Sequence, residues 1–196
     1  MTAEGNRFTY GIPAETQVTI KDIAKHLSKI CRFGGATRDF YSVAQHCVIA
    51  AQLAAEDDHD AYTQLYILLH DAHEYAIGDI PTPLGNHIDA LAGFDLIHEI
   101  KADADKMIYD GLGFKPPPDY IKEIVQKYDR IMFATEASQL LWEAKVPAYL
   151  EKWMEINEVR ARPHRIVPSD CWSAEQAYLT TYIRIVTHLG FHHLAI

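Results

Sequence analysis

In the first part of the chain, apolar positions recur every three or four residues behind residues that cap helices. The segment Thr19–Asp22 resembles a capping box, and apolar positions at helical spacing follow it as far as Ile30. Gly34-Gly35 is expected to end this helix. Ser42 begins a second capping box, and the helix behind it is predicted to end at the acidic stretch 56–58.

The next stretch predicts two more helices separated by a stiff loop. Asp60 can cap a third helix that reaches Glu74 or Tyr75. The segment Gly78–Pro83 is predicted to be a rigid loop, because each proline fixes its own φ and restricts the residue before it. A fourth helix is expected over about residues 95–109.

A fifth, long helix is predicted to begin at Pro116-Pro117-Pro118 and Asp119 and to run to about Lys145. A shorter helix is expected after Pro147.

The last helix has the clearest end signals in the chain. Ser173 is the expected N-cap, Gln176 closes its capping box, and Gly190 is the expected C-cap. The segment Arg160–Val167, before this helix, is predicted to be irregular.

No apolar run of period two is long enough to predict a sheet. The expected fold is therefore all-α, with one domain over residues 1–196. Its core would cover residues 19–145, and its C-terminal helices residues 147–196.

The composition narrows the range of partners. The chain has 196 residues and a formal charge of −9, from 27 acidic and 18 basic side chains. Binding to a nucleic-acid backbone needs clustered basic charge, so no nucleic-acid polymer is expected as partner. A small phosphate ligand stays open, because one metal ion and one or two arginines reverse the charge locally.

Cysteine usage and hydropathy bear on location. The three cysteines are widely spaced and form no CxxC pair, which favours a reducing compartment over a disulfide framework. No apolar run approaches the roughly 18 residues of a membrane span, and the first residues do not look like a secretory signal. We expect a cytoplasmic protein with no membrane partner.

The first sign of chemistry is the doublet His70-Asp71 at the polar end of the apolar run Leu65–Leu69. An imidazole beside a carboxylate is costly to bury unless something compensates both, and a divalent metal ion would do so. Four residues apart on a helix, His70 and Glu74 would share a face. His73 offers a competing pair with His70, but neither HExxH nor HxxEH is present.

A mononuclear site needs further ligands from other helices. His46, in the second predicted helix, and Asp129, in the fifth, are candidates on chemical grounds. With 11 histidines in the chain, other partners remain open at this stage. Read alone, His46 fits a core histidine, and Asp129 fits a buried salt-bridge partner.

Taken together, His46, the doublet His70-Asp71, Glu74, the loop Gly78–Pro83 and Asp129 resemble the HD superfamily of metal-dependent phosphohydrolases. The closest likeness is to the compact bacterial and phage 5′-deoxynucleotidases and deoxynucleoside triphosphate hydrolases. It runs from about Thr19 to Leu141, and its order is H…HD…D with the continuation E-x-x-x-GDIPTP.

The resemblance implies roles for the matching positions. His46, His70, Asp71 and Asp129 would hold one divalent ion, and Glu74 and Asp79 would orient or deprotonate the attacking water. The substrate contacts would be Arg32, Thr82 and Lys127. Lys127 lies beside Gln126, which occupies the place where relatives often carry a lysine.

The function expected from this resemblance is removal of phosphate from a nucleotide, a deoxynucleoside 5′-monophosphate or triphosphate. The ion would be Mn, Co, Fe, Ni, Zn or Mg, and two imidazoles favour the transition metals over Mg. A homodimer or higher homo-oligomer also fits the likeness. The alternatives are a cyclic-nucleotide phosphodiesterase, a non-catalytic HD sensor or scaffold, and a structural bundle that binds no metal.

Overall fold

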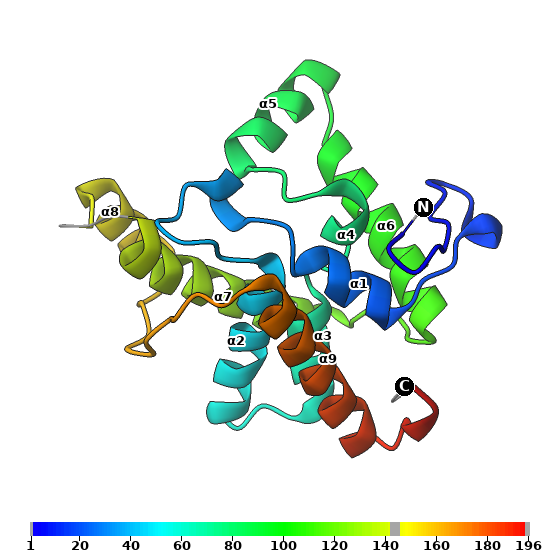
Figure 1. Ribbon diagram of the computed structural model, residues 1–196. Helices are drawn as coiled ribbons and strands as arrows, with labels where there is room; N and C mark the ends of the chain where they lie inside the picture. The colour runs from blue at the N-terminus through cyan, green and yellow to red at the C-terminus, as the bar shows by residue number, and fades with distance from the viewer. Residues whose placement is uncertain (1, 142–145, 195–196) are drawn as a thin grey trace.

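The protein, seen in a computed structural model, is a bundle of helices joined by turns and by longer loops (Figure 1). The structure describes residues 2–141 and 146–194. Over these ranges there is no strand, only an isolated bridge between Cys31 and Ser42, so the predicted all-α class is confirmed. The helices are α1 (Ile20–Leu27), α2 (Val43–Glu56), α3 (Ala61–Leu69), α4 (Glu74–Ile77), α5 (Thr82–Ala92), α6 (Leu96–Leu112), α7 (Asp119–Glu136), α8 (Ala148–Ile156) and α9 (Cys171–His188).

Three of the predicted N-caps are confirmed. The side chains of Thr19, Ser42 and Asp60 each accept a hydrogen bond from the backbone N–H three residues on, at the starts of α1, α2 and α3. These contacts satisfy backbone donors that a helix leaves unpaired at its first turn.

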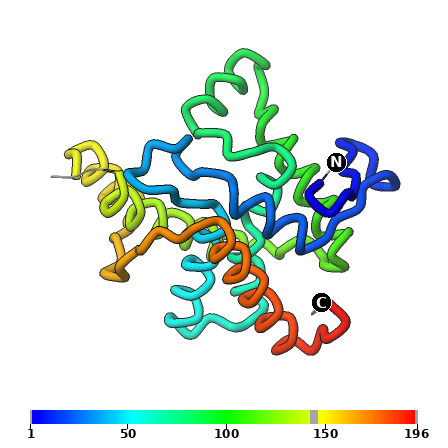
Figure 2. Tube along the Cα trace, viewed as in Figure 1, coloured from blue at the N-terminus to red at the C-terminus, as the bar shows by residue number. Residues whose placement is uncertain are grey.

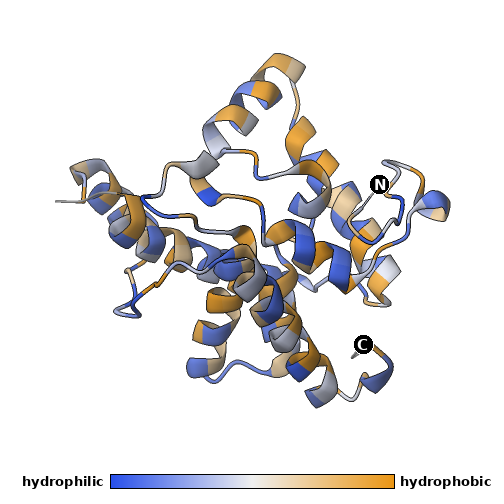
Figure 3. Cartoon of the chain, in the orientation of Figure 1, coloured by the Kyte–Doolittle hydropathy of each residue, from blue (hydrophilic) through white to orange (hydrophobic). Residues whose placement is uncertain are grey.

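The centre of the molecule is formed by α2, α3 and α9, with α7 packed against α2 and α3 (Figure 2). Every residue of α3 from Thr63 to Leu69 is buried. A helix that is apolar on all sides must be surrounded by others, which explains its central place. Hydrophobic and polar residues alternate along the outer helices (Figure 3). None of the helices seen in residues 2–141 and 146–194 combines the length and hydrophobicity needed to cross a bilayer.

The third helix is shorter than predicted. It ends at Leu69, and residues 70–73 form a turn before α4 begins at Glu74. In this turn the N–H of Ala72 bonds to the carbonyl of Leu69, and that of Glu74 to Asp71, over 2.9 and 3.0 Å. Such bonds, spanning three residues instead of four, wind the chain more tightly and end the regular α-helix.

The first helix is also shorter than predicted, so Ile30 lies outside it. It ends at Leu27, and the backbone then runs beside the segment before α2, where the N–H of Val43 bonds to the carbonyl of Ile30. The predicted stop at Gly34-Gly35 falls instead in a short 3-10 turn, Arg32–Gly35.

One helix was not predicted at all. The structure forms α5 from Thr82, inside the segment expected to be a loop, so the irregular stretch is only residues 78–81. Pro81 and Pro83 do not oppose this start, because proline is tolerated in the first turn of a helix. The fourth predicted helix corresponds to α6. The α5 and α6 helices lie against each other as a projecting pair (Figure 1).

The C-terminal elements follow the prediction with two shifts. The α7 helix ends at Glu136 and continues as a π-turn, Ala137–Leu141; its predicted end at Lys145 lies outside the described residues. The N-cap of α9 is Asp170 and not Ser173, because the Asp170 carboxylate accepts from the Ser173 N–H at 2.9 Å. Arg160–Val167 is irregular, as predicted.

Candidate metal centre and adjoining cavities

Two imidazoles face each other where α2 passes the end of α3. The Nε2 atoms of His46 and His70 are 3.1 Å apart; the side chain of His46 is fully buried and that of His70 is 8% exposed. His46 donates from Nδ1 to the Oε1 of Glu136 at 2.6 Å, and His70 donates from Nδ1 to the carbonyl of Ile67 at 2.7 Å. Because each Nδ1 is taken up by its own hydrogen bond, each Nε2 is the ring nitrogen left to hold a cation, either a proton shared with the carboxylates or a metal ion.

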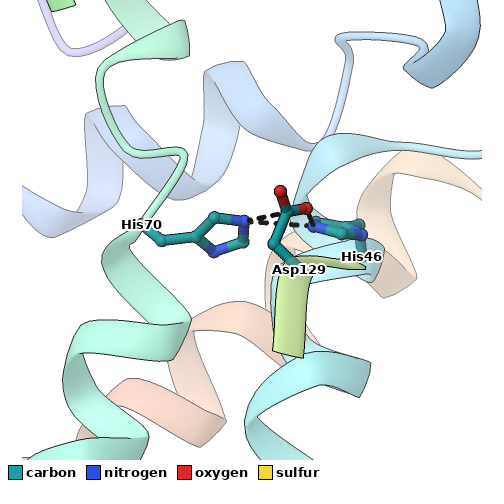
Figure 4. A group of neighbouring side chains, drawn as sticks. All are labelled: His46, His70 and Asp129. Carbon is teal, nitrogen blue, oxygen red and sulfur yellow. Dashed lines mark hydrogen bonds and ion pairs between the residues drawn. The ribbon is translucent and has the colours of Figure 1, made fainter. Parts of the chain in front are cut away.

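Two carboxylates complete this cluster, and one of them, Asp129, is drawn with the two imidazoles in Figure 4. Asp129, on α7, places Oδ1 3.5 Å from the Nε2 of His46 and 3.7 Å from that of His70. Asp71, in the turn after α3, places Oδ2 3.6 and 3.2 Å from the same two nitrogens. The four residues expected to be ligands are therefore brought together from three separate parts of the chain.

The spacing of these atoms suits a divalent cation. Ligand atoms about 2.1 Å from an ion are roughly 3.0 Å apart at neighbouring octahedral corners and roughly 3.4 Å apart in a tetrahedron. The distances from the two nitrogens to each other and to the carboxylates run from 3.1 to 3.7 Å. Two nitrogens this close repel unless a cation lies between them, so these groups can hold a metal ion.

The electrostatics of the cluster also favour positive charge. Burial alone would lower the pKa of His70, but the carboxylates of Asp71 and Asp129 raise it well above its ordinary value. Burial alone would raise the pKa of Asp129, but hydrogen bonding to His46 and His70 brings it well below the ordinary range. Burial would also raise the pKa of Asp71, but the neighbouring imidazoles of His70 and His46 lower it, so this carboxyl stays ionised.

A buried network behind His46 was not found from the sequence. Glu136, fully buried on α7, accepts from His46, from the hydroxyl of Tyr41 at 2.8 Å and from the Nε of Arg32 at 3.1 Å. Arg32 also donates from Nη1 to the Oδ2 of Asp71 at 3.3 Å. The one available signal was a glutamate in the strongly apolar end of the fifth predicted helix.

The cluster opens on a cavity of about 560 Å³, which Asp71 and Asp129 line on one side. Glu74, Asp79 and Thr82 line it as well, so the structure places these three predicted site residues beside the metal centre. Arg32 also faces this cavity. Aromatic side chains form another part of the wall: Phe33, Phe133 and Trp153.

The carboxylates of this cavity repel one another. Burial, followed by the charges of Asp71 and Asp79, raises the pKa of Glu74 to about 9. Burial likewise raises the pKa of Asp79. Such crowding of acids is stabilised by a cation held nearby.

The structure does not bring Lys127 to this cavity. Lys127 is exposed on α7, whereas the cations that line the cavity beside Arg32 are Lys101 and Arg130. On α7, Arg130 directly follows Asp129 in the chain. Lys101 lies on α6. Its place at the cavity could not be predicted from the sequence, because no neighbouring residue indicates that α6 folds back over the centre.

A second cavity, of about 570 Å³, borders the centre at His70. His70 and His73 contribute to its wall together with Tyr66 and Tyr109, and Lys101 lines both cavities. The centre therefore borders two cavities, one at Asp71 and Asp129 and one at His70.

Two bacterial proteins are similar to this chain over most of their length, while no known family profile matches it. Uncharacterized protein YfdR of Escherichia coli is 37% identical over 139 residues, which are 71% of this chain and 70% of that protein. An uncharacterized protein of Rhodobacter capsulatus is 30% identical over 140 residues, 69% of each chain. Because each match has at least 30% identity and covers more than two thirds of both aligned chains, this chain belongs to the family of bacterial proteins that includes YfdR.

Proposed function

We propose that the protein is a metal-dependent phosphohydrolase of the HD superfamily that removes phosphate from a nucleotide, a deoxynucleoside 5′-monophosphate or triphosphate. One observation carries this proposal. The atoms His46 Nε2, His70 Nε2, Asp71 Oδ2 and Asp129 Oδ1 cluster beside a cavity that also contains two further carboxylates and several cations.

The four clustered residues would hold the ion. A bound divalent ion would neutralise charge at the phosphate and lower the pKa of a water ligand toward about 7. The residues of this chain then have to position substrate and water, which is most of what phosphoryl transfer asks of a protein.

Glu74 and Asp79 are the groups proposed to orient the attacking water or take its proton. Both line the cavity beside Asp71, and neither belongs to the four clustered atoms around the two imidazoles. A carboxylate in this place can accept a proton and pass it to solvent as the phosphate leaves.

Arg32 is proposed to bind the substrate phosphate. Its Nε donates a hydrogen bond to Glu136 and its Nη1 donates one to Asp71. These two bonds fix the guanidinium plane at the cavity wall. In the described residues no hydrogen bond uses Nη2, so this donor is left for a phosphate oxygen. Lys101 and Arg130 add positive charge, and Thr82 offers a hydroxyl.

The test is a phosphate-release panel on purified protein loaded with Mn²⁺, Co²⁺ or Mg²⁺. The substrates are deoxynucleoside and ribonucleoside mono- and triphosphates and a cyclic nucleotide. Release from a deoxynucleoside phosphate is expected, with a loss of about 100-fold or more in Glu74→Gln.

Glu99→Gln, an exposed position on α6, is the matched control and should keep full activity. Turnover of the cyclic nucleotide alone would indicate a phosphodiesterase. Metal-loaded protein that releases phosphate from no substrate would refute the hydrolase and favour a sensor.

A further inference from the structure

His73 is held in the same way as the two histidines of the metal centre. It is 6% exposed, and its Nδ1 donates to the Oδ1 of Asp105 at 3.0 Å. This bond leaves Nε2 as a bare acceptor, and Nε2 is buried with no hydrogen-bond partner among the described residues. A histidine ligand is usually fixed through its other nitrogen by a carboxylate or a carbonyl in this manner.

Glu74 carries a matching unpaired atom. Its side chain is 4% exposed, and within the described part of the chain its Oε2 has no hydrogen-bond partner. Asp71, His73 and Glu74 each offer one potential ligand atom, and these three atoms lie within 4.8 Å of one another. Leaving buried polar atoms unpaired costs about 1–3 kcal/mol each, so this arrangement points to a ligand that satisfies them.

The turn after α3 explains why these side chains converge. The bond from the Glu74 N–H to the Asp71 carbonyl spans three residues. Side chains three apart eclipse each other in such a tight turn, which brings the carboxylates of Asp71 and Glu74 to one side. Two carboxylates held side by side repel unless a cation lies between them.

We propose that Asp71, His73 and Glu74 form a second divalent-cation site, which shares Asp71 with the centre at His46 and His70. Asp71 is suited to bridging, because a carboxylate has two oxygens and Oδ2 already faces the two imidazoles. One imidazole and two carboxylates favour Mn²⁺, Fe²⁺, Co²⁺ or Zn²⁺ over Mg²⁺ and Ca²⁺. This site goes beyond the proposed function, since it concerns binding of an ion and needs no substrate. Glu74 would bind the ion through Oε2, which leaves its other oxygen for the water of the proposed reaction.

The experiment counts ions on the full chain. Protein stripped with a chelator is dialysed against increasing Mn²⁺ or Co²⁺, and bound metal per chain is measured by elemental analysis and by calorimetric titration. Wild type should bind two ions of different affinity, and His73→Gln should bind one. Asp105→Asn should bind two, with the second about 10–100-fold weaker, because the support of the ligand is lost.

His98→Gln is the matched control. His98 is exposed and lines the same cavity as His73, so this variant should keep both ions. The double variant His192→Gln, His193→Gln, near the end of the described chain, should also keep both.

One ion in wild type at saturation would overturn the site, and so would two ions in His73→Gln. An unchanged second affinity in Asp105→Asn would overturn it even if His73→Gln failed to fold, which circular dichroism would reveal. No nucleotide is present, so a chain that binds two ions but releases no phosphate would refute the hydrolase alone.

Discussion

The Nδ1 of His46 lies 2.6 Å from the Oε1 of Glu136, in a part of the molecule that water does not reach. This bond fixes the imidazole with its Nε2 toward His70. Glu136 is thus the residue that orients a core histidine as a candidate metal ligand, although its own carboxylate does not line the cavity beside the cluster.

Replacing Glu136 by glutamine should weaken metal binding about 10–100-fold. The amide can still accept from Nδ1, but the charge that stabilises the imidazole and Arg32 is gone. Competition with a fluorescent chelator measures the affinity. Glu123→Gln, exposed on the same helix, should leave it unchanged, and an equal loss in both variants would contradict the role given to Glu136.

Binding of a metal ion should stabilise the fold. Without a cation, the four clustered side chains repel one another and are partly removed from water. The unfolded chain does not bring them together, so the ion binds the folded state alone. At a free Mn²⁺ or Co²⁺ concentration 100 times Kd, the gain is about 2.7 kcal/mol, which corresponds to about 5–10 °C in Tm for a chain of this size. Thermal melts with and without chelator measure this shift. A Tm shift that persists in His70→Gln would place the stabilising ion elsewhere.

Lys101 should matter for substrate binding, and Lys127 should not. A charge-assisted hydrogen bond to phosphate is worth about 1.5–3 kcal/mol, so Lys101→Ala should raise KM about 10–100-fold. Lys127→Ala is its control, because that side chain points to solvent on α7. Steady-state kinetics on the best substrate of the panel distinguish the two variants. A larger effect from Lys127→Ala would contradict the cavity described above.

Asp57 should make stability depend on pH. Its Oδ2 accepts from the Tyr128 hydroxyl at 2.6 Å and pairs with Arg162. The Tyr128 bond, more than the Arg162 charge, lowers the pKa of Asp57 in the folded protein. Its stabilisation is therefore complete above the unfolded pKa of about 3.9 and is lost as the pH falls through the lower folded pKa.

Asp57→Asn should cost about 1 kcal/mol at pH 7, and the difference from wild type should shrink at pH 3. Urea unfolding at the two pH values measures it. Asp58→Asn, at the exposed neighbouring position, is the control. A difference that grows on acidification would contradict the ionised pair.

The sequence predicted those features that depend on neighbouring residues. Thr19, Ser42 and Asp60 cap helices because a hydroxyl or carboxylate reaches an N–H only three residues away. The clustering of His46, His70, Asp71 and Asp129 was predicted by their order in a known pattern, and the distances between their atoms agree with it.

The missed features depend on segments far apart in the chain. Glu136 is buried because Arg32, 104 positions earlier, supplies its counter-charge. Lys101 reaches the centre only because α6 folds back, and the break after Leu69 appears only in the backbone hydrogen bonds. The α5 helix was missed because its prolines were interpreted as loop residues.

The tight turn between Leu69 and Glu74 also sets what this segment tolerates. Several of the chemically important side chains lie within five positions, and each is aimed by its place in the turn. One inserted residue would rotate everything behind it by about 100° and carry Glu74 away from Asp71. The length of this segment is therefore fixed, and so is the small side chain of Ala72, which is fully buried in the turn.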